Sequence, residues 1–152
     1  MSDSSANLDL FSGLVVYYLN DKLFCANYND VFAIVIPADY PKNFSHSYLI
    51  NSNLEIENVA ISVIDLHSLF KLKRHKITLT SRIISLEIEG HTIGFLVDKV
   101  EEVITLNTSM RNDFKFIEYK NEKLLAGKVK YHDAVFYLPN FKKIVNESID
   151  HY

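Results

Sequence analysis

The chain has 152 residues, of which 48% are hydrophobic, and its formal net charge is −3. This length fits one domain or two small lobes sharing a core, and the hydrophobic content excludes a disordered chain. The 16 lysines and arginines are scattered, and the one basic run, at 71–76, is typical of a solvated linker, so we expect no nucleic-acid partner.

The N-terminal ten residues are polar and are expected to form a flexible tail, with residues 11–152 forming the folded domain. This tail lacks the features of a secretory signal, and no apolar run reaches the ~18 residues of a membrane span. Cys25 is the single cysteine, which excludes an internal disulfide and favours a small core residue. We therefore expect a cytoplasmic protein with no direct membrane insertion.

The first predicted elements are two strands in VVYYLNDKLFCANY, separated by a turn at Asn20–Asp21, because both residues tolerate turn geometry. The following segment, Tyr28–Ile34, is interpreted as one or two helical turns capped by Asn27 or Asn29.

The segment LEIENVAISVIDL is interpreted as one strand whose alternation slips by one residue between Ile56 and Val59. Such a slip would exchange the buried and exposed faces unless a bulge or sharp bend accommodates an extra residue. Since Glu57 and Asn58 lie at the slip, we expect Glu57 to point outwards at a corner. A short helix is predicted next, over Asp65–Phe70.

The clearest hairpin is RIISLEIEGHTIGFLV, with apolar residues at 84, 86 and 88 on one face and at 93, 95 and 97 on the return strand. Two further turns are predicted near residues 120–122 and at His132–Asp133. A last short helix follows Pro139 and Asn140. Many short strands with turns every 8–12 residues indicate a mainly β protein, a barrel or sandwich.

The stretch IGFLVDKVEEVI carries three carboxylates, Asp98, Glu101 and Glu102, within five residues. The spacing of Val97, Val100 and Val103 favours a strand that ends at Asp98, passes through one helical turn with a solvated acidic side, and resumes at residue 103. An acid/base or ligand site that uses Asp98 or Glu101 with a histidine is the alternative.

Other catalytic signals are missing from the sequence. It contains no phosphate-binding glycine loop, no zinc-type histidine spacing and no nucleophile elbow. We expect no catalytic residues, no metal and no cofactor.

Four segments in the same order resemble the CheW-like domain family, the coupling proteins of bacterial chemotaxis arrays. The most specific is IGFLVDKVEEVITL, which follows the family's V-G-hydrophobic-hydrophobic-V-D-x-V-x-x-V. LEIENVAISVIDL aligns with I-N-L-R-G-x-x-x-P-V-(I/V)-D-L. KLFCANYNDVFAIVIP is similar to a strand, short helix and proline segment, and LLAGKVKYHDAVFYL to the closing hairpin with its glycine, Gly127. The resemblance covers about Val15 to Val145.

This resemblance implies two five-stranded, SH3-like β-barrels around a shared core, with short helices, in a single CheW-like domain. It also implies a scaffold without catalysis. One surface would bind the CheW-like regulatory domain of the histidine kinase CheA, and another the cytoplasmic tip of a chemoreceptor, so that the protein is recruited to membrane-associated arrays.

The resemblance also implies a set of protein-binding residues. These are Val31, Ile34, Gly94 and Val103, with the corner Glu57–Asn58 in place of the family's Arg–Gly. The corner exchanges a cation for an anion, which would weaken contact with an acidic receptor groove. Each residue has a structural alternative: Val31, Ile34 and Val103 as core residues, and Gly94 as a point of close backbone approach.

Three hypotheses follow from the sequence. The first is an adaptor that couples a histidine kinase to chemoreceptors. The second is a diverged scaffold of a motility or pilus-type array without normal receptor binding. The third is an enzyme or small ligand-binding barrel that uses Asp98 or Glu101.

Overall fold

A computed structural model of the chain describes residues 11–37, 49–73, 77–107 and 111–150, with residues 49–54 and 148–150 described by their backbone alone. The predicted N-terminal tail and residues 74–76 of the basic run lie outside the described residues. No helix within the described ranges is long and apolar enough to cross a membrane.

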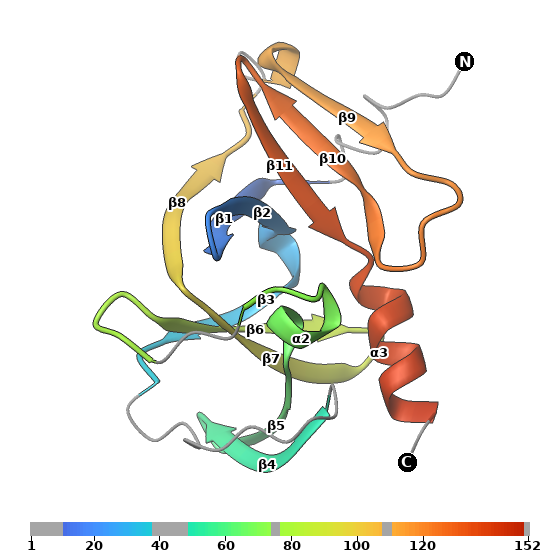
Figure 1. The fold of residues 1–152 in the computed structure, drawn as a ribbon. Coiled ribbons are helices and arrows are strands. Elements are labelled where there is room, and N and C mark those ends of the chain that lie inside the picture. The colour runs from blue at the N-terminus through green and yellow to red at the C-terminus, as the bar shows by residue number, and fades with distance from the viewer. Residues whose placement is uncertain (1–10, 38–48, 74–76, 108–110, 151–152) are drawn as a thin grey trace.

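Strands make up most of the described chain (Figure 1). They are β1 (Gly13–Leu19), β2 (Lys22–Asn27), β3 (Val31–Val35), β4 (Leu49–Ile56), β5 (Val59–Ile64), β6 (Arg82–Ile88), β7 (His91–Val97), β8 (Lys99–Thr105), β9 (Phe114–Glu118), β10 (Leu125–Tyr131) and β11 (Ala134–Pro139). The helical segments are η1 (Tyr28–Asp30), α2 (Leu66–Leu69), η2 (Arg111–Asp113) and α3 (Phe141–Asp150). The prediction of a mainly β protein with few short helices is confirmed.

The strands form a six-stranded sheet in the order β8-β1-β2-β11-β10-β9 and a five-stranded sheet in the order β3-β6-β7-β5-β4. Figure 1 shows the first above the second, with β8 rising from one to the other. Each sheet contains an antiparallel hairpin, β1–β2 or β6–β7, and the strand that follows each hairpin joins the other sheet. The two lobes are therefore intertwined, which the sequence did not predict, and one sheet has six strands rather than the expected five.

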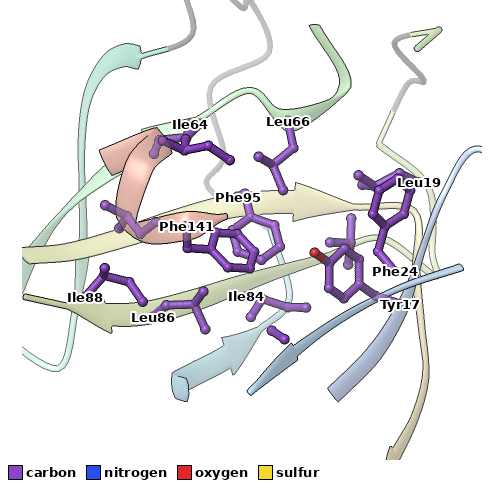
Figure 2. Close-up of a cluster of buried hydrophobic side chains, with 14 of the residues drawn as sticks. Tyr17, Leu19, Phe24, Ile64, Leu66, Ile84, Leu86, Ile88, Phe95 and Phe141 are labelled. Carbon is purple, nitrogen blue, oxygen red and sulfur yellow. The ribbon is translucent and has the colours of Figure 1, made fainter. Parts of the chain in front are cut away.

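The largest buried cluster draws on both sheets and on α3, which confirms the shared core. Tyr17 of the six-stranded sheet packs against Phe95 of the five-stranded sheet with ring centroids 5.4 Å apart, and Phe95 stacks on Phe141 of α3 at 5.3 Å. Figure 2 shows these three rings in one row. Cys25 is buried in a second cluster within the six-stranded sheet, as expected.

The predicted β6–β7 hairpin is confirmed, with a two-residue turn at Glu89–Gly90. Both turn residues have positive φ, 49° and 81°, as tight hairpins require. The apolar residues of both strands that were expected on one face lie in the shared core.

The two later helices also form where the sequence predicts them. The Asp65 carboxylate caps α2 by accepting a hydrogen bond from the Ser68 backbone N–H at 3.2 Å. The apolar stripe of α3, formed by Phe141, Ile144 and Val145, is buried in the shared core.

The prediction of helical turns over Tyr28–Ile34 is wrong in its second half. Only η1 is helical, and Asn27 caps it by accepting from the Asn29 backbone N–H at 3.0 Å. The chain then becomes strand β3, which pairs with β6. The β-branched residues at 31, 34 and 35 fit a pleated strand better than a helix, and pairing with β6 decides between the two.

Candidate protein-binding surfaces

The segment that contains Glu57 and Asn58 is a hairpin, so the prediction of one strand with a bulge or bend is wrong. Ile56 at the end of β4 pairs directly with Val59 at the start of β5. Glu57 and Asn58 are the two turn residues between them, with φ of 51° and 65°. The apparent slip in the alternation is a reversal of the chain. Both side chains are exposed at the tip, so Glu57 does point outwards.

Strand β3 carries the two candidate residues Val31 and Ile34. It forms one edge of the five-stranded sheet and pairs only with β6 among the described strands. Val31 is half-buried and packs against the shared core, whereas Ile34 leaves 37% of its surface exposed. Ile34 is thus available to a partner, and Val31 contributes mainly to the core.

Gly94 is buried in the middle of the five-stranded sheet, between β6 and β5. A Cβ atom at this position would lie 3.1 Å from the Ile61 methyl carbon and 3.3 Å from that of Ile83. The glycine therefore allows the two isoleucines to close over β7, and any influence on a partner would act through this packing.

The predicted helical turn after Asp98 is wrong, because residues 99–105 form one strand, β8. In the pairing of β8 with β1, Val16 lies opposite Glu102 and Tyr17 opposite Val100, which leaves Glu101 as the extra residue of a β-bulge. This bulge, rather than a helical turn, explains why Val100 and Val103 stand three residues apart.

Val103 lies on the outer surface of β8, an edge strand of the six-stranded sheet. Its side chain is 49% exposed, although its neighbour Ile104 is buried. With about half of its surface exposed, Val103 is not a core residue and is accessible to a partner.

Asp98 was expected among solvated acids, but it is partly buried at the junction of the two sheets, with 20% of its side chain exposed. One of its carboxylate oxygens accepts from the Asn20 backbone N–H in the β1–β2 turn and contacts His67 Nε2 at 3.1 Å. Its backbone oxygen accepts from the Thr80 hydroxyl at 2.8 Å. Asp98 therefore joins segments from both lobes.

The alternative of a chemical site around Asp98 does not fit this arrangement. His67 is only 3% exposed, so its ring is covered by the protein rather than open to a substrate. Across residues 11–37, 49–73, 77–107 and 111–150, no group of three or more His, Cys, Asp or Glu side chains is arranged to hold a metal ion.

Glu101 and Glu102 are exposed, as expected, and they border a shallow groove of about 390 Å³ that faces the β10–β11 turn. A second hollow of similar volume lies between η1, the β6–β7 turn and α3. There, Glu89 pairs with Lys142 at 3.4 Å, and partial burial raises the pKa of Asp30.

Sequence reasoning missed both the groove and the contact of Asp98 with His67. Neither has a local signal, since the groove joins β8 to a turn some thirty residues later, and Asp98 and His67 are 31 positions apart. Among the described residues it also missed four exposed large apolar side chains: Tyr28 in η1, Ile36 after β3, Leu79 before β6 and Ile117 on β9.

Two comparisons with known proteins agree with this structure. Residues 13–148 match the CheW-like domain family. The fold is similar to that of the scaffolding protein TtCheW from Thermoanaerobacter tengcongensis, with 23% sequence identity, a TM-score of 0.66, and coverage of 85% of this chain and 84% of the other. No curated protein sequence matches the chain. Because the family match covers most of the chain, this protein belongs to the CheW-like domain family, a family of non-catalytic scaffolding adaptors.

Proposed function

We propose that this protein couples a histidine kinase of the CheA type to the cytoplasmic tips of chemoreceptors by protein–protein binding. Membership of a scaffolding family supports a binding role. The observation that carries the proposal is that two residues named by the family pattern, Ile34 and Val103, are exposed, one on an edge strand of each sheet. Each sheet thus presents an apolar side chain that folding alone does not require at the surface.

Binding of the kinase is assigned to the β3 edge. Ile34 is accessible there, while Val31 beneath it holds the strand on the shared core. Edge strands offer unpaired backbone groups beside such side chains, a combination that suits a protein partner.

The test measures binding of the CheW-like regulatory domain of the cognate kinase by isothermal titration calorimetry. Ile34→Asp should weaken binding by at least tenfold, because it places a charge in the interface. This corresponds to a loss of binding free energy on the order of 1.4 kcal/mol or more. Ile117→Asp is the matched control, since Ile117 on β9 is 39% exposed against 37% for Ile34. Equal binding by the two variants would overturn the assignment of the β3 edge.

Binding of a receptor is assigned to the surface of β8 around Val103 and to the turn Glu57–Asn58. The positive φ of both turn residues is compatible with the Arg–Gly pair of the family pattern, since glycine adopts it freely. The departure from the family is therefore one of charge rather than backbone shape. A carboxylate stands where the family has a guanidinium.

This charge reversal favours a second candidate function, a diverged scaffold that has lost normal receptor binding. The candidates are separated by the variant Glu57→Arg, with Asn58→Gly as a control for backbone strain alone. If the charge excludes the receptor, Glu57→Arg alone should raise affinity for a cognate receptor fragment by roughly tenfold. If wild type already binds and Glu57→Arg changes nothing, the diverged-scaffold candidate is eliminated.

A further inference from the structure

The groove beside the bulge of β8 has the form of a small binding site. It lies where β8 faces the turn that joins β10 to β11, and its volume is about 390 Å³. It is separate from Val103, because Val103 does not line it. The groove therefore needs its own explanation, beyond the proposed kinase and receptor contacts.

The floor of the groove is apolar. Val16 and Phe136 are buried members of the second core cluster, and Leu23 packs against the same cluster. An aliphatic chain laid on this floor would be shielded from water on one side.

The rim of the groove is acidic. Glu101 and Glu102 border one side and Asp133 the other, and within the described chain no lysine or arginine lines the groove. Lys99 pairs with Glu101 at 3.4 Å, whereas neither Glu102 nor Asp133 forms an ion pair with any described residue. The uncompensated charge at the rim is therefore negative.

The β10–β11 side of the groove is held in place before any partner arrives. Tyr131 and Ala134 pair across a two-residue turn in which His132 has a φ of 53°. The His132 ring lies 4.2 Å from the ring of Tyr131, which in turn stacks on Phe114 at 4.2 Å. A preorganised rim lowers the entropic cost of binding.

We propose that this groove receives an arginine side chain, flanked by apolar residues, from an extended segment of a partner protein. An arginine stem is apolar enough for the floor, and its guanidinium can reach carboxylates on both sides of the rim. The charge of the rim thus selects a basic partner over an acidic or neutral one.

The test is amide NMR of the full-length protein titrated with a hexapeptide of alternating leucine and arginine. We expect shift changes at the amides of Glu101 and Glu102 and at residues 131–136. The same peptide with citrulline in place of arginine removes the charge at nearly constant shape. It should bind at least about fivefold more weakly, because a charge-assisted hydrogen bond is about twice as strong as a neutral one.

The variant Glu102→Gln with Asp133→Asn should weaken the arginine peptide by about tenfold, because it removes the two unpaired rim charges. The control Glu122→Gln with Glu147→Gln removes the same net charge from exposed positions elsewhere and should bind as wild type does. Circular dichroism and thermal unfolding check that all variants fold.

Three results would overturn the proposal. The first is shift changes spread over other acidic surfaces, and the second is equal weakening by both double variants. The third is spermidine giving the same shifts at the same affinity, since the occupant would then be a soluble polyamine. None of these outcomes depends on kinase or receptor binding, so they test the groove independently of the proposed function.

Discussion

Replacing Asp98 by alanine tests the finding that one acid of the stretch DKVEE joins the two lobes while its neighbours are solvated. The substitution removes the acceptor for the Asn20 backbone N–H and the partner of His67 Nε2. A hydrogen bond to a charged group contributes about 1.5–3 kcal/mol. With 20% of the Asp98 side chain exposed, part of this is screened, so we expect a loss of roughly 2–4 kcal/mol.

The assay is urea unfolding followed by circular dichroism, supported by thermal melts. For a domain of this size, the expected loss corresponds to a fall in Tm on the order of 10 °C. Asp98→Asn retains an oxygen acceptor and should lose about half as much free energy. Glu101→Ala is the matched control, because its ion pair with Lys99 lies at the surface and contributes less than about 0.5 kcal/mol. If Asp98→Ala and Glu101→Ala cost the same, Asp98 does not hold the lobes together.

Three further predictions concern the core. The Tyr17 hydroxyl is buried and has no hydrogen-bond partner among the described residues, so Tyr17→Phe should raise the free energy of unfolding by about 1 kcal/mol; a loss of that size in urea titrations would contradict this. In Gly127→Ala, the added Cβ would lie 2.2 Å from the Ile117 backbone oxygen, so the free energy of unfolding should fall by roughly 2–3 kcal/mol. Gly90→Ala is the control: its added Cβ meets nothing within 4 Å, and the positive φ at this position should cost only about 1 kcal/mol. Burial raises the pKa of the Cys25 thiol. The free energy of unfolding should therefore fall as pH rises through about 8.5, where the thiol of the unfolded chain ionises. Iodoacetamide should label Cys25 only after unfolding, and rapid labelling of the native protein would contradict this burial.

Most of the strands could be predicted because they depend on local patterns, whereas the shared core was implied by the family resemblance. The alternation of apolar residues in β6 and β7 places one face of each strand in the core, and the Asp65 cap marks the start of α2. These patterns involve residues within a few positions of each other, so tertiary contacts do not alter them.

The sequence predictions were wrong where one extra residue or an unusual turn changes the spacing of apolar residues along a strand. Spacing of three between Val100 and Val103 fits a helical turn and also a bulge, and pairing with β1 decides for the bulge. The Glu57–Asn58 turn lacks the glycine that usually marks a tight hairpin, so its two flanking strands read as one.

The candidate binding residues could be named from the family pattern but not divided into surface and core. Gly94 and Val103 come from the same motif, yet one is buried and the other is exposed. Exposure depends on which strands lie at sheet edges, and that order is set by pairings between distant segments.

The central claim is that one chain bridges a kinase and a receptor. It is tested most directly by co-sedimentation of the cognate kinase with vesicles that display the receptor's cytoplasmic tip. Kinase should sediment only when this protein is present. Recruitment should be lost with Ile34→Asp or Val103→Asp and retained with Ile117→Asp. Kinase that sediments equally without this protein, or that is never recruited in its presence, would contradict the claim.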